Sequence, residues 1–131
     1  MSTTKHANEI RRLVNQKIDI VNQLRIEHKD EHQDFISGYI EIRLESIVGD
    51  IDHLILEEVE RMSCTLTVPL IHKIGSLPDK YPMTHVAPSM IEICKFKETL
   101  KKRLCDHYRA FGYVVEINDM TPLMNLRISW H

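Results

Sequence analysis

The first half of the chain contains almost nothing that would break a helix. No proline occurs between Thr3 and Met62, and glycine occurs there only at Gly38 and Gly49. Proline and glycine are the residues that most disfavour a helix interior. Apolar side chains recur at steps of three and four residues on both sides of a polar stretch at residues 27–34. This spacing is that of one helix face, so we predict two long N-terminal helices within residues 1–62.

The polar stretch at residues 27–34 leaves two arrangements open. It is either a turn that joins the two helices in a helical hairpin, which we favour, or a polar segment of one long helix. Ser2 or Thr3 is the expected N-cap of the first helix. The first apolar stripe extends from Ile10 to Leu24 and the second begins at Phe35.

The two apolar stripes are long for the amount of chain that remains to cover them. Helices of about 25 residues are roughly 38 Å long. We therefore expect these stripes to be buried against another copy of the chain, in a homodimer or a higher oligomer. The predicted interface residues lie in the second stripe and are Ile36, Ile40, Leu44, Ile47 and Ile51.

After Met62 the pattern changes to that of a small α/β segment. The β-branched residues at 65–68 predict a short strand, which residues 70–74 could extend. Residues 75–89 hold three prolines and Gly75. They predict a loop of about fifteen residues, and loops of that length are usually functional or mobile.

A helix and a β-hairpin are expected at the C-terminus. Ser89 and Glu92 have the spacing of a capping box, and Gly112 is the expected helix stop. Apolar residues alternate at 113–117 and again at 126–130, which predicts two strands with a turn between them. The side chains expected to point inward from the helix are Ile93, Leu100, Leu104 and Phe111.

These elements define an α+β fold in one domain of residues 1–131. It has a helical segment at residues 1–64 and an α/β segment at residues 65–131. The first strand is expected to pair with the C-terminal hairpin, which makes a small antiparallel sheet.

Composition narrows the function. The chain has 131 residues, of which 43% are hydrophobic, and a formal net charge of -2. These values exclude a disordered chain and give no overall attraction for nucleic acid. Three cysteines at no metal-ligand spacing indicate a reduced, cytoplasmic protein, and no apolar run approaches the length of a membrane span. Phosphate-binding and nucleophile motifs are missing from the sequence, so we expect neither enzymatic activity nor a cofactor.

One motif has the spacing of a zinc site. His28, Glu31 and His32 match the H-x-x-E-H pattern of inverted zinc peptidases, in which two histidines bind zinc and the glutamate is the base. The flanking residues are polar, and no third ligand can be identified. We interpret the motif as a solvated helix end or turn and expect no metal there.

A basic run on the helix at residues 89–111 is the basis of an alternative function. A basic helix followed by a hairpin also ends winged-helix DNA-binding domains, in which such residues contact phosphates. Acidic residues dilute the run, and a solvated helix face is the interpretation we favour. The candidate nucleic-acid contacts are Lys95, Lys101, Lys102, Arg103 and Arg109.

The C-terminus resembles a known group of proteins. Gly112-Tyr113-x-Val115 and Leu126-x-Ile128-Ser-Trp130, which follow a helix, are similar to the ending of many small proteins of tailed bacteriophages. The resemblance covers about a quarter of the chain and implies a phage accessory or assembly protein in the host cytoplasm or the virion. It implies a structural unit and identifies no functional site.

We therefore expect a non-enzymatic, homo-oligomeric interaction or assembly protein with an additional protein partner. A nucleic-acid-binding regulator is the alternative, and a zinc-dependent hydrolase ranks third. No membrane partner is expected.

Trp130 is the only tryptophan, and it shares a predicted strand face with Leu126 and Ile128. We expect it to anchor the last strand, so that Trp130→Ala costs several kcal/mol of stability, as is usual for large core aromatics. Thermal unfolding of the variant measures this cost, and an unchanged melting temperature would refute the structural role.

Overall fold

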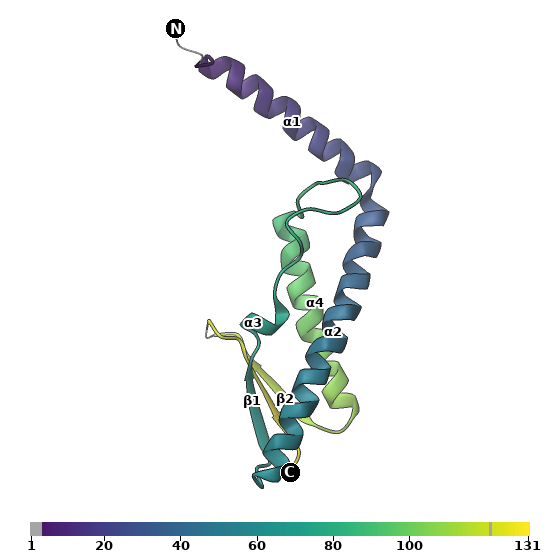
Figure 1. Cartoon of the computed structure of the whole chain (residues 1–131), viewed down its shortest axis with the longest axis vertical. Coiled ribbons are helices and arrows are strands. Elements are labelled where there is room, and N and C mark those ends of the chain that lie inside the picture. The colour runs from purple at the N-terminus through teal and green to yellow at the C-terminus, as the bar shows by residue number, and fades with distance from the viewer. Residues whose placement is uncertain (1–3, 121) are drawn as a thin grey trace. The chain divides into compact units, whose positions relative to one another are not determined.

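The computed structural model describes residues 4–120 and 122–131 (Figure 1). Its elements within these residues are α1 (Ala7–Glu27), α2 (Lys29–Glu60), β1 (Thr65–Pro69), α3 (Ile71–Ile74), α4 (Met90–Ala110), β2 (Val114–Asn118) and β3 (Asn125–Ser129). This order confirms the predicted α+β class, with two long helices followed by a strand, a later helix and a C-terminal hairpin.

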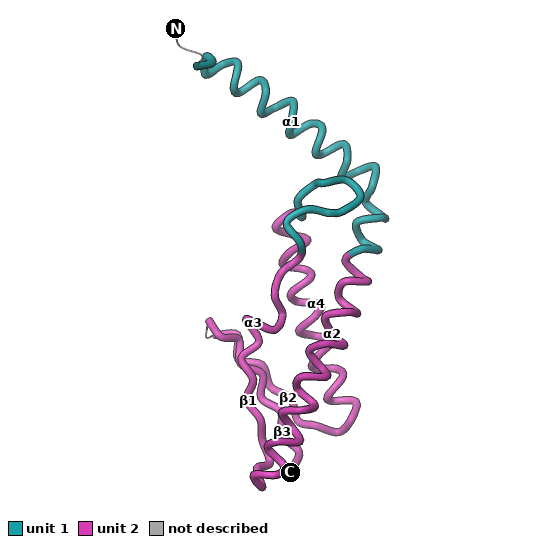
Figure 2. Tube along the Cα trace, viewed as in Figure 1, with its two compact units in different colours: residues 1–35, 78–88 teal, residues 36–77, 89–131 magenta. Residues whose placement is uncertain are grey.

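The chain divides into two compact units (Figure 2). The first combines the described part of residues 1–35 with residues 78–88, and the second comprises residues 36–77 and 89–131. α2 contributes its first seven residues to the first unit. The second unit therefore contains residues from both predicted segments, the helical segment at residues 1–64 and the α/β segment at residues 65–131.

The two N-terminal helices are separated by a single residue. α1 ends at Glu27, and His28 leaves helical geometry with φ −111° and ψ 23°, while its backbone N–H still donates to the Leu24 carbonyl. This interruption lies in the predicted polar stretch, so the segment forms two helices. At the start of α1, the ring of His6 accepts a hydrogen bond from the Asn8 backbone. The expected caps Ser2 and Thr3 lie outside the described residues.

Both ends of α4 follow local rules that the sequence displays. The Ser89 hydroxyl accepts from the Glu92 backbone at 3.2 Å, and the Glu92 carboxylate accepts from the Ser89 backbone at 2.9 Å. At the other end Gly112 has φ +89° and donates to the Arg109 carbonyl, while the Tyr113 N–H reaches back to Tyr108. This pair of hydrogen bonds is a Schellman motif, which confirms the predicted helix stop.

Phe111 does not point inward as expected. It is the C-cap of α4, and its side chain is 72% exposed. The helical spacing that predicts an inward position ends one residue earlier, where the chain leaves the helix.

The three strands form one antiparallel sheet in the order β1-β3-β2. β3 is central, and Ile128 lies opposite Leu66 on one side and Val115 on the other. The predicted pairing of the first strand with the hairpin is therefore confirmed. Residues 70–74 do not extend β1, because the strand ends at Pro69 and Ile71–Ile74 form a helical turn. Proline has no N–H to donate to a ladder, so it suits the end of a strand.

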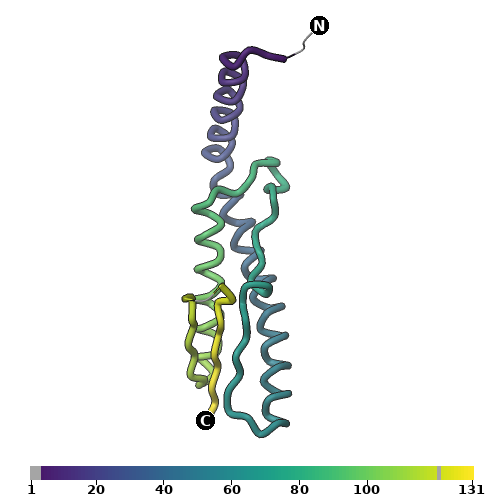
Figure 3. The backbone as a smooth tube through the Cα atoms, turned by 90° about the vertical axis from the view of Figure 1, so that its left-hand side faces the viewer, coloured from purple at the N-terminus to yellow at the C-terminus, as the bar shows by residue number. Residues whose placement is uncertain are grey.

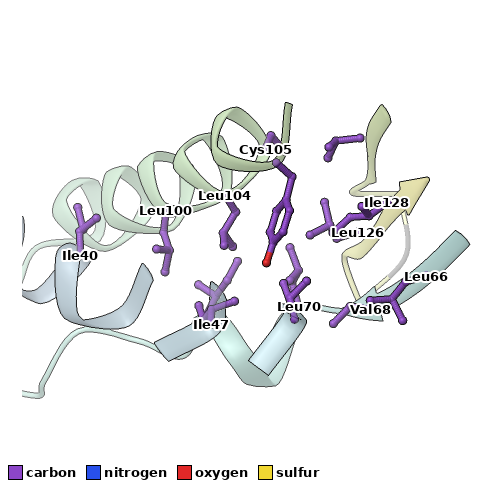
Figure 4. Packing of buried hydrophobic residues seen from close by; sticks show 14 of the residues in the cluster. Ile40, Ile47, Leu66, Val68, Leu70, Leu100, Leu104, Cys105, Leu126 and Ile128 are labelled. Carbon is purple, nitrogen blue, oxygen red and sulfur yellow. The ribbon is translucent and has the colours of Figure 1, made fainter. Parts of the chain in front are cut away.

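The core of the second unit lies where α2, α4 and the sheet converge (Figures 3 and 4). Leu100 and Leu104 of α4 meet Ile40 and Ile47 of α2, and Leu126 and Ile128 of β3 close the cluster (Figure 4).

The predicted interface residues belong largely to this core. Ile40, Ile47 and Ile51 are buried within the chain's own cluster, and Ile36 and Leu44 pack against it. The first three therefore offer no surface to a second copy, which corrects the prediction. The reason is that α4 and the sheet supply the cover that we expected from another chain.

Trp130 follows β3 and packs against the core cluster. Its ring meets Tyr113 edge-on, with the ring centroids 6.3 Å apart, and its backbone N–H donates to the Cys64 carbonyl just before β1. Trp130 thus links the last strand to both neighbouring segments. Because its side chain is only partly buried, the cost of Trp130→Ala should fall at the lower end of the expected range.

Two glycines provide a matched test of the backbone geometry. An added Cβ at Gly112 or at Gly49 meets no atom within 4 Å, but only Gly112 has a positive φ. Gly112→Ala should therefore destabilise the protein by about 1 kcal/mol, because a side chain disfavours that geometry. Gly49→Ala, within α2, should stabilise it by about 0.5–1 kcal/mol through helix propensity. Urea unfolding measures the change in the free energy of unfolding for each variant. A change in the same direction for both would contradict the positive φ assigned to Gly112.

Candidate protein-interaction surfaces

The first candidate surface is the apolar face of α1. Its members recur at helical spacing and none of them is buried, although Val21 and Leu24 are partly covered. Val14 is 50% exposed. We call this face the α1 stripe, and it consists of Ile10, Leu13, Val14, Lys17, Val21 and Leu24.

The α1 stripe is unusual for a helix of a globular domain. A surface helix normally turns its apolar face to the core, and side chains at i, i+3, i+4 and i+7 make that face continuous. In α1 this face has no buried member. Lys17 lies in the middle of the stripe, seven residues from both Ile10 and Leu24, so the face combines apolar side chains with one central positive charge.

The second candidate surface is a groove on the second unit, between α2 and the C-terminal part of α4. It consists of two adjoining hollows of about 450 and 290 Å³, which share Val48 and His107. We call it the α2–α4 groove. The larger hollow is lined by Val48, Asp52, Ile55, Leu56, His107, Tyr108, Phe111 and Tyr113, and the smaller by Glu41, Leu44, Glu45, Val48 and His107.

The groove combines apolar walls with acidic groups on one side. Leu56 and Phe111 are 65% and 72% exposed, so the groove presents two large apolar side chains to solvent. Glu41, Glu45 and Asp52 all come from the α2 side. Glu41 pairs with Arg103 at 2.7 Å, whereas Glu45 has no ion pair within residues 4–120 and 122–131.

A buried tyrosine fixes the base of the groove. The Tyr108 hydroxyl donates to Asp52 Oδ1 at 2.8 Å, with the Val48 carbonyl oxygen at 3.3 Å. Burial raises the pKa of Tyr108 well above its ordinary value of 10, and the hydrogen bond to Asp52 adds to the shift. The phenol therefore keeps its proton and holds the Asp52 carboxylate in place at the edge of the groove.

The H-x-x-E-H segment is not the wholly solvated helix end or turn that we expected, because His32 is buried against the loop at residues 78–88. His28 Nδ1 lies 3.2 Å from the carboxylate of Glu31, which is three residues further along the chain. His32 is buried, and its Nε2 lies 2.9 Å from the Thr84 hydroxyl. The described residues contain no group of three His, Cys, Asp or Glu side chains arranged to hold a metal ion.

His32 instead holds the proline-rich loop within the first unit. Its ring stacks on Tyr81 with centroids 4.0 Å apart, and Phe35 meets the same tyrosine edge-on at 5.8 Å. The loop is closed by a hydrogen bond from the Tyr81 N–H to the Val86 carbonyl at 2.7 Å, and Arg25 donates to Ala87 at 3.2 Å. The part of the predicted loop at residues 78–88 is thus packed on His32 and Arg25.

Three of the five candidate nucleic-acid contacts are engaged within the chain. Lys101 is buried and lies 2.8 Å from Glu98 and 3.4 Å from Asp119. Burial alone would lower the pKa of Lys101, but the hydrogen bond to Glu98 and the charge of Asp119 outweigh it and raise the pKa.

The other four candidate residues differ in whether they contact another group of the chain. Arg103 pairs with Glu41, and Arg109 donates to the Val115 carbonyl at 3.1 Å. All four of these residues are exposed, and of the five candidates only Lys101 is buried. Lys95 and Lys102 form no ion pair with other described residues, so they are the two candidates that no intramolecular contact engages.

The α2–α4 groove was not predicted from the sequence. Tyr108 continues the inward spacing of Leu100 and Leu104 by one more step of four residues, so its burial could have been read from the pattern. Asp52 and His107 carry no such signal, because their roles depend on how α2 and α4 pack.

The chain has no detectable similarity to a known family. It matches no family model, no curated protein and no solved structure.

None of the helices formed by the described residues has both the length and the apolar character of a membrane span.

The buried phenol of Tyr108 predicts a specific dependence of stability on pH. Above pH 10 an unfolded tyrosine loses its proton, whereas the native Tyr108 retains it, so the native state binds more protons. The free energy of unfolding should therefore fall as the pH rises beyond that point. Tyr108→Phe has no phenol at this position, so its free energy of unfolding should fall less over the same pH range. Urea unfolding at about pH 9 and about pH 11 compares the two proteins, and an identical pH dependence would contradict the assignment.

Proposed function

We propose that this protein is a non-enzymatic interaction protein that associates with itself through the α1 stripe. The observation that carries the proposal is that an amphipathic helix of 21 residues has no buried side chain. Exposed apolar surface of this kind usually marks an interaction site. Burial against a second copy would remove it from water and would contribute the hydrophobic free energy that the isolated helix lacks.

The proposal moves the expected interface from α2 to α1. The apolar residues of α2 at 40, 47 and 51 are buried in the core, so the self-association that we infer uses the other N-terminal stripe. The similarity of the C-terminal helix and hairpin to small proteins of tailed bacteriophages favours an accessory or assembly role, with a further protein partner and a cytoplasmic or virion location. These parts of the proposal rest on that resemblance alone.

The alternative of nucleic-acid binding is less well supported. Lys101, Arg103 and Arg109 have intramolecular partners, so three of the five candidate residues are already engaged. Phosphate binding depends on several such cations acting together, since each phosphate contact adds its own share of the affinity.

The test compares two neighbouring positions on α1. Val14→Asp places a charge in the stripe, whereas Asn15→Asp adds the same side chain one residue further around the helix. Both positions are exposed, so neither change should unfold the chain. Wild type and Asn15→Asp should form a defined oligomer, and Val14→Asp should weaken it at least ten-fold, because an unpaired buried charge costs well over 1.4 kcal/mol.

Native mass spectrometry at tens of micromolar measures the oligomer. A strictly monomeric wild type would overturn the proposal, as would equal association of the two variants. Circular dichroism of each variant confirms that the helices remain formed.

A further inference from the structure

We propose that the α1 stripe of one copy docks in the α2–α4 groove of a second copy, with Lys17 facing Glu45 and Asp52. The inference rests on the proposed self-association and names the surface that receives the stripe. It is carried by the position of Lys17, by the acidic groups of the groove and by the matching lengths of the two surfaces.

Lys17 argues against the simplest alternative, in which two α1 stripes pair with each other. In a two-fold symmetric pair of parallel helices, each residue lies opposite its own equivalent. In a fully overlapped antiparallel pair, the central residue lies opposite itself. Lys17 is the centre of a stripe from Ile10 to Leu24, so both arrangements bring two lysines together. Like charges opposed at an interface are strongly unfavourable.

The α2–α4 groove offers negative charge, which is opposite to the positive charge of Lys17. Glu45 and Asp52 are seven residues apart on α2, so they lie on one face of the helix about 10 Å apart along its axis. Glu45 forms no ion pair within the part of the chain that the structure describes. The Tyr108 hydroxyl orients one oxygen of Asp52, and the other has no hydrogen-bond partner among the described residues. Each of these carboxylates is therefore available to an ammonium group, and because they lie about 10 Å apart, one lysine pairs with only one of them at a time.

The surroundings of these groups are complementary as well. Residues 10–24 contain three basic and one acidic side chain, whereas residues 41–60 contain seven acidic and one basic. The apolar parts also correspond, since the exposed Leu56 and Phe111 of the groove offer surface on which the apolar side chains of the stripe can pack.

The lengths of the two surfaces agree. The stripe extends over fourteen residue steps from Ile10 to Leu24, which is about 21 Å of helix. The α2 side of the groove extends over fifteen steps from Glu41 to Leu56, which is about 22 Å. Each copy carries one stripe and one groove, so in a two-fold dimer each stripe has a groove to bind and the two contacts are equivalent.

A charge exchange between Lys17 and Glu45 tests the contact. Lys17→Glu and Glu45→Lys each place like charges at both contacts of a homodimer, and each should weaken dimerisation at least ten-fold in analytical ultracentrifugation. An equimolar mixture of the two variants should recover dimers. In a mixed dimer the K17E helix meets the E45K groove, and the wild-type helix meets the wild-type groove.

Two control variants lie five residues away on the same helices. Arg12→Glu and Asp50→Lys make the same changes of charge about 140° around α1 and α2, away from the stripe and the groove. Both should dimerise as wild type does, although Asp50→Lys also loses a surface ion pair with Lys73.

The outcomes separate this inference from the proposed function. If Glu45→Lys dimerises like wild type while Val14→Asp does not, the stripe mediates association but the groove does not receive it, and the inference is wrong. If the single variants weaken dimerisation but their mixture does not restore it, the inference is also wrong. A monomeric wild type would overturn both proposals.

Discussion

The second unit depends on the packing of one face of α4. Phe96, Leu100, Leu104 and Tyr108 are buried at steps of four residues, and this row meets α2 and the sheet at once. Full burial of a large apolar side chain stabilises a fold by about 1.5–3 kcal/mol. The row therefore supplies much of the free energy that holds the strands to the helices. It also covers the apolar face of α2, which removes the need for a second chain there.

The local signals in the sequence predicted the elements well. The Ser89–Glu92 capping box and the glycine after α4 act within a few residues, so their outcome does not depend on the rest of the chain. The alternation around Val115 and Ile128 likewise identifies the inward face of each strand. These signals were sufficient to predict the α+β class and the C-terminal hairpin.

Which part of the protein covers each helix face could not be predicted from such local signals. A stripe such as Ile40, Ile47 and Ile51 shows that a helix face avoids water, but helical spacing does not tell whether α4 or another copy covers it. His28 and His32 present the same difficulty, because their spacing only places two rings on one face. Thr84, the partner of His32, lies 52 residues further along the chain. The α2–α4 groove was missed for this reason too.

The central lysine of the α1 stripe gives the proposed association its selectivity. A wholly apolar stripe would associate with almost any apolar surface, including another copy of itself in several registers. Burying an ammonium group without a partner is costly, so Lys17 disfavours every arrangement that does not offer a carboxylate. A single polar residue in an apolar seam is known to fix register in the same manner. The acidic side of the groove meets this requirement, so the residue that weakens the stripe as a hydrophobic surface also defines which surface it can bind.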